Sequence, residues 1–221
     1  MTDPASRDRG LRFRIGDAFP SDDPIARWAT VLGMAINNTV YVNIRIIEGE
    51  LPPELHVYYF RLVAAHFFES CVWLEDTPRH WPQVAEFLHE LSQDSLDKLE
   101  RLQGFAKQDH PQHERLRRLR NTMFHYPEMH PSKERAGIEE LAKALHDARD
   151  VVSSIEGGLE YASFRASFAD EVTVQFVSPD DEGIKTLLEE LSGPMFELIE
   201  FGEQVLLAHL KRIDSGMVTP F

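Results

Sequence analysis

The segment RLRRLRNTMFHYPEMH, at residues 115–130, brings together residue types that could do chemistry. Arg120 is followed directly by Asn121, and four residues separate it from His125. A guanidinium can hold an anion, an amide can orient a neighbouring group, and an imidazole can transfer a proton near neutral pH. The segment is therefore a candidate for a catalytic pair, for a metal site or for a solvated helix face.

A helix is expected to carry this segment. The spacing of apolar residues predicts a helix from about Pro111 to His125, and Pro127 disfavours helical geometry at the residue before it. Arg120 lies at the edge of the apolar stripe of this helix. A guanidinium beside a core is costly unless it meets a carboxylate or other acceptors, so we expect a partner for Arg120.

The two candidate groups do not meet on a regular helix. Five residues turn a helix by about 500°, which leaves Arg120 and His125 roughly 140° apart. They can converge through the reach of Arg120, through unwinding before Pro127, or across a two-fold axis. His125 lies at the end of the helix, where the helix dipole favours the imidazolium.

Arg120, Asn121 and His125 together resemble the motif of the HEPN superfamily, in which an arginine, four to six residues and a histidine follow one another and a polar residue often succeeds the arginine. The sequence LRRLRNTMFHYPE, a short loop and ERAGIEELAKALHDA also resemble the helix–loop–helix of abortive-infection-type HEPN domains. The resemblance covers residues 25–155. It implies a helical protein whose site forms at a dimer cleft.

The resemblance implies metal-independent cleavage of RNA, in which the ribose 2′-hydroxyl attacks the neighbouring phosphate. His125 would move a proton, Arg120 would hold the phosphate, and Asn121 would orient a group. Arg117 and Arg118 would bind phosphate as well. We expect no cofactor and no metal. The alternative on the same scaffold is a non-catalytic module that binds a nucleotide or a protein.

A helical metal-binding protein is the second alternative. Glu86 and His89 have the spacing of a di-iron half-site, but no second such unit follows, and a surface pair is favoured. Four histidines cluster in the sequence, but prolines interrupt their spacing, so a shared zinc would depend on the fold. These are His110, His113, His125 and His130.

Further residues have a structural and a functional interpretation. A second Arg–x4–His pair, Arg61 and His66, has leucine after the arginine. His66 and Glu69, one turn apart, are expected to form a buried pair, or alternatively the acidic region that meets Arg120. The three tryptophans are expected to pack a core or an interface rather than to stack on bases. They are Trp28, Trp73 and Trp81.

The charge of the chain is uneven. Its 221 residues carry a net charge of −14, which on average repels a phosphate backbone. Residues 101–120, however, hold six basic and two acidic residues, so an anionic ligand is expected there. The single cysteine, Cys71, excludes an intramolecular disulfide and a cysteine-rich zinc site. No apolar run is long enough to cross a membrane, and we expect a cytoplasmic protein.

Helical periodicity dominates the rest of the sequence and predicts an all-α fold, an antiparallel bundle of five or more helices. The expected helices begin near residues 24, 52, 82, 111, 138 and 181. The second is apolar around nearly its whole circumference and should be central, the third should run from Pro82 to Leu102, and Ser192-Gly193-Pro194 should kink or split the last.

The domain organisation follows from the same pattern. Residues 1–21 are polar and are expected to form a mobile arm, and residues 22–221 a single domain. Alternating apolar residues predict one small β-hairpin at about 159–177. The second and fourth helices carry more apolar and aromatic surface than one small bundle covers, so we expect a homodimer.

Overall fold

The computed structural model describes residues 11–12, 14–47, 53–124, 143, 146, 155–156, 165–166, 181–213 and 219–220. These residues are mostly helical, which confirms the all-α class. The helices are α1 (Ile15–Ala18), α2 (Pro24–Ile47), α3 (Pro53–His80), α4 (Pro82–Leu88), α5 (Gln93–Gly104), α6 (His113–Phe124) and α9 (Asp181–Arg212). The short strands are β1 (Leu11–Arg12), β2 (Ile155–Glu156), β3 (Arg165–Ala166) and β4 (Thr219–Pro220).

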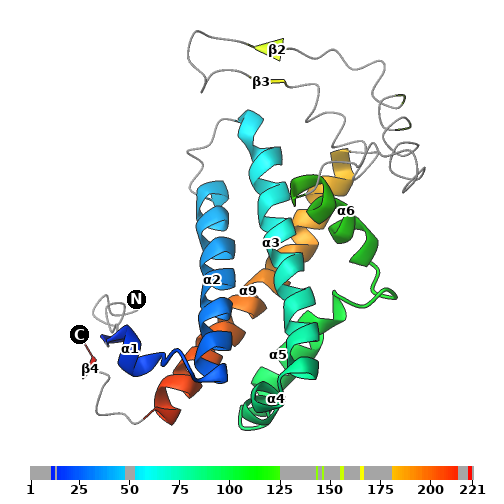
Figure 1. Cartoon of the computed structure of the whole chain (residues 1–221). Helices are drawn as coiled ribbons and strands as arrows, with labels where there is room; N and C mark the ends of the chain where they lie inside the picture. The colour runs from blue at the N-terminus through cyan, green and yellow to red at the C-terminus, as the bar shows by residue number, and fades with distance from the viewer. Residues whose placement is uncertain are drawn as a thin grey trace, which may run out of the picture.

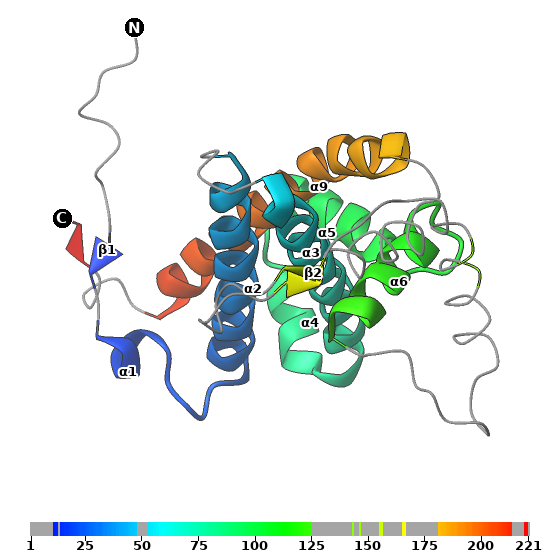
Figure 2. The ribbon, with the colours of Figure 1, turned by 90° about the horizontal axis from the view of Figure 1, so that it is seen from above.

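Helix α3 is the centre of the described structure. It contacts α2, α4, α5, α6 and α9, and α6 lies on the opposite side of α3 from α2 (Figures 1 and 2). Buried side chains point to several sides of α3, as the apolar circumference predicted; among them are Ala64, Phe67, Phe68, Cys71 and Leu74. Because α3 is enclosed by its neighbours, Arg61, His66 and Glu69 of its middle turns are only partly exposed.

Helix α9 closes the core from a second direction by packing on α2 and α5. Its apolar stripe is fully buried and consists of Leu187, Leu191, Leu198, Phe201 and Val205. At Gly202 the helix approaches α2 so closely that an added Cβ would overlap Cδ1 of Ile36. Glycine at this position therefore sets the spacing between α2 and α9.

One of the expected helices is wrong. The helix expected from Pro82 to Leu102 is two helices, because the chain turns after Leu88 and restarts at Ser92. The Ser92 hydroxyl accepts a hydrogen bond from the backbone N–H of Ser95, which is the usual N-cap contact. Of the kink or split expected at Ser192-Gly193-Pro194, the split does not occur, since α9 continues through Pro194 as one helix.

Other predicted elements agree with the structure or fall on residues that it does not describe. Helix α6 has nearly the bounds predicted for it. Lys143 and His146 are helical, and the rest of the expected helix at 138–152 is outside the described residues. Strand β2 pairs antiparallel with β3, with Ile155 opposite Ala166, but most of the span from 159 to 177 is not described. The hairpin at 159–177 stays a prediction.

The described part of the N-terminal segment contacts the end of α9. Ala18 of α1 is buried, and its carbonyl accepts a hydrogen bond of 2.9 Å from Nε2 of His209. Asp23 forms an ion pair with Arg212, and β1 pairs antiparallel with β4. Residues 1–10 lie outside the described part, so the boundary of the expected arm is not tested.

The close approach at Gly202 predicts that two glycine substitutions change the stability of the protein in opposite directions. Gly202→Ala should destabilise the protein by about 1–3 kcal/mol, because Ile36 must move out of its packed position. Gly33→Ala, where no atom lies within 4 Å of the added Cβ, should stabilise α2 by about 0.5–1 kcal/mol. Urea unfolding measures both free energies. A Gly202→Ala protein as stable as Gly33→Ala would contradict the packing described for α2 and α9.

His209 predicts a pH dependence of stability. Burial lowers its pKa below the ordinary value of 6.5, and the hydrogen bond to Ala18 only partly opposes this. Below pH 6.5 the unfolded chain therefore takes up a proton that the folded chain resists, and stability falls as the pH drops toward the folded pKa. His209→Gln, which does not titrate, should lose less stability than wild type between pH 7.5 and 5.5 in urea unfolding. Equal losses would show that His209 does not titrate in this way.

Candidate functional site

Arg120 is held between α6 and α3. On the inner face of α6, the side chains of Leu116 and Leu119 are buried against α3. Arg120 lies beside them, at the edge of this contact. There Nε of Arg120 forms an ion pair with Oε1 of Glu69. The Arg120 and Glu69 side chains keep 33% and 38% of their exposure, so the pair lies at the rim of the interface and stays open to solvent. The expected carboxylate partner of Arg120 is thus Glu69.

His66 lies one turn before Glu69 on α3 and is half-buried. Burial lowers the pKa of His66, and the negative charge of Glu69 opposes this shift. A cation, a carboxylate and an imidazole, from Arg120, Glu69 and His66, therefore lie along one boundary between two helices. Of the two interpretations of His66 and Glu69, the one in which Glu69 meets Arg120 agrees with the structure.

Of the other two residues of the candidate motif, Asn121 is among the described residues and His125 is not. Asn121 is half-buried, one position along α6 from Arg120. His125 lies just beyond the end of α6, outside the described residues. The convergence of Arg120 and His125 stays a prediction.

The two arginines expected to bind phosphate share one carboxylate within α6. Arg117 contacts Glu114 through Nε and Nη2 at 2.8 Å each, and Nε of Arg118 lies 2.9 Å from the same carboxylate. These contacts lower the pKa of Glu114 to about 2, and the hydrogen bond from Arg117 has the largest effect. Both pairs follow from spacings of three and four residues on a helix, which sequence reasoning overlooked. The basic charge of α6 is therefore partly neutralised from within.

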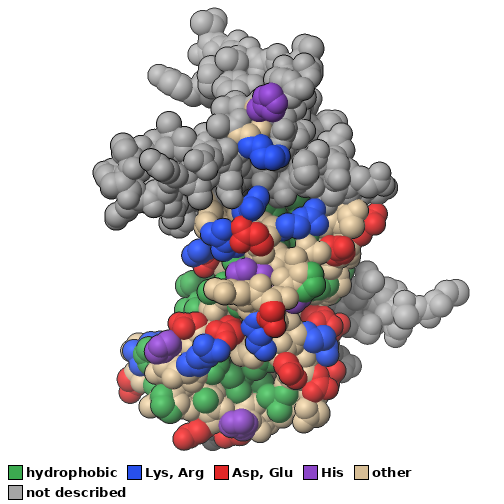
Figure 3. Space-filling model, turned by 90° about the vertical axis from the view of Figure 1, so that its right-hand side faces the viewer, with side chains coloured by type: hydrophobic (Ala, Val, Ile, Leu, Met, Phe, Trp, Pro, Cys, Tyr) green, Lys and Arg blue, Asp and Glu red, His purple; other side chains and the backbone are tan. Residues whose placement is uncertain are grey.

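The face that includes α6 has a mixed charge. Viewed from this side, Lys and Arg side chains gather near the boundary of the described surface, with Asp and Glu side chains among them (Figure 3). A phosphate approaching this face would meet cations that already have carboxylate partners. Such a surface favours anions less than the count of basic residues in the sequence indicates.

No described residues form a metal centre. Among them there is no group of three or more His, Cys, Asp or Glu side chains that could hold an ion. Glu86 and His89 are exposed at the end of α4, as expected for a surface pair. His110 packs on Phe105 at a ring distance of 4.1 Å, and Nδ1 of His113 lies 3.2 Å from the Phe105 carbonyl. His125 and His130 lie outside the described residues.

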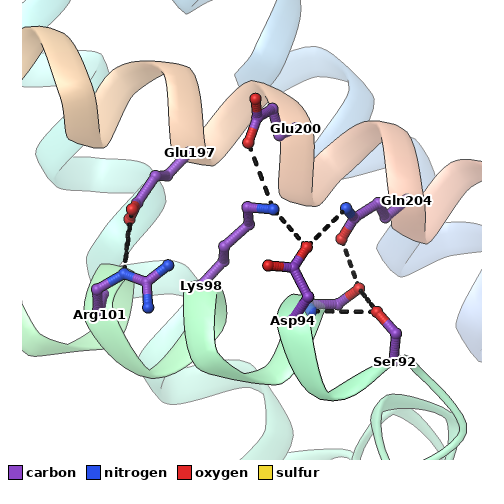
Figure 4. A network of polar contacts seen from close by, with 8 residues as sticks. Ser92, Asp94, Lys98, Arg101, Glu197, Glu200 and Gln204 are labelled. Atoms are coloured by element: carbon purple, nitrogen blue, oxygen red, sulfur yellow. Dashed lines mark hydrogen bonds and ion pairs between the residues drawn. The ribbon is translucent and has the colours of Figure 1, made fainter.

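A second polar cluster joins α5 to α9 and contains residue types found in catalytic sites (Figure 4). The Ser92 and Ser95 hydroxyls lie 2.8 Å apart, and Ser95 donates to Oε1 of Gln204. Nε2 of Gln204 donates in turn to Asp94 at 3.2 Å. The chain of contacts links residues more than a hundred positions apart, so it fastens the last helix to α5.

The lysine of this cluster argues against catalysis there. Nζ of Lys98 lies 2.6 Å from Asp94 and 3.3 Å from Glu200, and Arg101 pairs with Glu197 one turn away. The hydrogen bond with Asp94 raises the pKa of Lys98, whereas a lysine that activates a serine needs a lowered pKa. We therefore interpret this cluster as a structural link, and Arg120 and Glu69 remain the candidate site.

Comparison with known proteins adds no relative. No protein-family model, no curated protein and no solved structure matches this chain. Among the described helices, none combines the length and the apolar composition needed to cross a membrane.

The ion pair of Arg120 and Glu69 predicts a modest coupling energy. A double-mutant cycle with Arg120→Ala and Glu69→Ala should give about 0.5–1 kcal/mol, the range for partly exposed pairs, and the value should shrink in high salt. The free energies come from urea unfolding at low and at high salt. A coupling near zero at low salt would mean that the two side chains do not interact in solution.

Proposed function

We propose that this chain is a helical, HEPN-like protein that cleaves RNA without a metal ion, through Arg120, Asn121 and His125. The observation that carries the proposal is the position of Arg120. Its guanidinium lies at the solvent-facing rim of the contact between α3 and α6, anchored to Glu69 through Nε. An arginine that is both anchored and exposed is suited to hold a phosphate in a fixed orientation.

The proposed reaction is an internal transfer at phosphorus. The ribose 2′-oxygen forms a bond to the neighbouring phosphorus while the bond from phosphorus to the 5′-oxygen breaks. A base removes the proton of the 2′-hydroxyl, and the leaving oxygen receives a proton. His125 performs a proton transfer, Arg120 stabilises the charge on the phosphate, and Asn121 orients a group by a hydrogen bond.

Glu69 acts in this proposal as a positioning residue. A guanidinium carries five N–H donors in a fixed plane, and the contact with Glu69 is made through Nε. A carboxylate on that edge fixes the plane of the guanidinium, and the fixed plane suits contact with a phosphate through the Nη groups. The same carboxylate repels a phosphate, so Glu69 is also expected to weaken substrate binding.

The proposal includes the assembly that the resemblance implies. A homodimer would allow Arg120 of one copy to meet His125 of the other, which a separation of about 140° on one helix disfavours within a single copy. RNA is the proposed partner and the cytoplasm the proposed location. The scaffold that goes with this function is an antiparallel bundle with one small hairpin at about 159–177.

The second candidate is a non-catalytic module on the same scaffold that binds a nucleotide or a protein. The ion pairs of Arg117, Arg118 and Arg120 with carboxylates favour it, because each basic group already has an internal partner. The net charge of −14 favours it as well, since RNA is repelled by such a chain on average. A helical metal-binding protein, the third candidate, has no described cluster of ligands in its support.

Cleavage of single-stranded RNA in a chelator tests the proposal. Arg120→Ala and His125→Ala should each slow cleavage by roughly a hundredfold or more if these groups act in the transition state. Arg101→Ala is the matched control, because Arg101 also forms an ion pair between helices but lies outside the candidate site. It should cleave like wild type, and circular dichroism should show that all variants are folded.

Two outcomes count against cleavage by this pair. Equal rates in wild type, Arg120→Ala and His125→Ala would remove the pair from the chemistry. Failure of wild type to cleave any RNA tried would favour the non-catalytic module instead.

A further inference from the structure

The segment that precedes α2 contacts the last turns of α9 through one imidazole. Nε2 of His209 donates a hydrogen bond of 2.9 Å to the carbonyl of Ala18, and the Phe19 ring lies 4.9 Å from the His209 ring. The pairing of β1 with β4 and the ion pair of Asp23 with Arg212 flank this contact, and α1 lies beside the end of α9 (Figure 1). His209 is therefore the buried centre of the attachment.

The segment itself contributes little to the core. Among its side chains described from residue 14 to residue 20, that of Ala18 alone is buried, and Ile15 keeps 75% of its exposure. Neither Ala18 nor His209 belongs to the apolar cluster that surrounds α3. A part with so little buried apolar surface can open at a small cost in free energy while the rest of a protein stays folded.

The imidazole of His209 is satisfied on one nitrogen only. Its side chain has a relative exposure of 0%. Because a carbonyl oxygen only accepts, Nε2 carries the proton of the neutral ring and Nδ1 presents a lone pair. Nδ1 is buried without a hydrogen-bond partner among the described residues. A second proton on the ring would therefore place an unpaired N–H and a positive charge inside the contact.

The charged groups around His209 do not offset this cost. Arg212, on the same helix, disfavours a second cation, whereas Asp23, just before α2, favours it. Asp23 is already paired with Arg212, and the side chains of Arg14 and Asp17 in the segment are exposed. Burial has the largest effect on the ring and lowers the pKa of His209 below 6.5. The docked segment thus favours the neutral imidazole.

We propose that His209 is a proton-sensitive latch: as the pH falls from 7.5 to 5, the segment from Leu11 to Phe19 leaves the last turns of α9 while the helices around α3 stay folded. In the open state water solvates the imidazole, so the ring accepts a proton without the cost of burial. Docking weakens by up to about tenfold per pH unit below the ordinary pKa of the ring, because opening takes up one proton. The latch is independent of RNA cleavage at Arg120.

A second pH-sensitive contact of the segment titrates in a different range. Burial raises the pKa of Asp23, but the hydrogen bonds from the N–H of Ile25 and from Arg212 outweigh this effect and hold the pKa below its ordinary value of 3.8. The carboxylate of Asp23 therefore stays charged at pH 5, and its pair with Arg212 persists. The range from pH 7.5 to 5 isolates the titration of His209.

Methyl NMR of the alanine-labelled full chain tests the latch, with circular dichroism as the measure of the helices. The signal missing from Ala18→Ser identifies Ala18. Between pH 7.5 and 5 this signal should move toward the position of an alanine methyl group in an unfolded chain, because Ala18 is no longer buried. The helical circular dichroism signal should stay constant. The midpoint of the Ala18 change should coincide with the titration of the His209 ring, whose proton signal is the one missing from His209→Gln.

Two histidine variants separate the latch from other effects of acid. His209→Gln can still donate an amide N–H to the Ala18 carbonyl but takes up no proton, so its Ala18 signal should keep the docked position down to pH 5. His80→Gln is the matched control, because His80 is an exposed histidine at the end of α3. Its Ala18 signal should respond to pH as in wild type.

Three results would overturn the latch. The first is a wild-type Ala18 signal that keeps its position down to pH 5. The second is a loss of helical signal that accompanies the movement of Ala18, since the whole protein would then unfold. The third is an Ala18 response that is the same in His209→Gln as in wild type, or whose midpoint differs from that of the His209 ring. No RNA is present in these measurements, so none of the results depends on cleavage.

Discussion

Burial of α3 on several sides is the constraint on which the rest of this structure depends. A helix enclosed by α2, α4, α5, α6 and α9 has little surface left for polar groups. Glu69 lies at the boundary with α6, where solvent still reaches its carboxylate. The candidate site is thus a product of one buried helix and takes its second wall from α6.

The arginines of this chain illustrate how an acidic protein uses cations. Arg101, Arg117, Arg118, Arg120 and Arg212 all contact carboxylates, some within a helix and some between helices. The pairs between helices join segments far apart in sequence, whereas those within α6 only lower the local positive charge. A net positive stretch in the sequence is therefore weaker evidence for an anion site than it first suggests. Arg120 differs from Arg117 and Arg118 because its partner lies on another helix.

Sequence patterns predicted the parts of the fold that local chemistry determines. The apolar circumference of α3 and the prolines at the starts of α2 and α3 identified these helices, and the requirement of Arg120 for a carboxylate was predicted from its position beside Leu116. The break between α4 and α5 was missed, since apolar spacing continues across Ser92 and hides the cap. The stacking of Trp28 on Trp73 was missed for another reason. Trp28 and Trp73 are far apart in the sequence, and only the packing of α2 on α3 brings them together.

The position of α9 has a consequence for how the chain acquires its structure during synthesis. The ribosome releases α2 to α6 long before α9, yet the apolar stripe of α9 covers surfaces of α2 and α5. Nε2 of His209, on α9, donates a hydrogen bond to the carbonyl of Ala18, 191 positions earlier in the chain. Until the last helix emerges, those surfaces remain exposed to water and to other chains. Such a topology delays completion of the core until α9 has been synthesised and lengthens the interval in which a nascent chain attracts chaperones or aggregates.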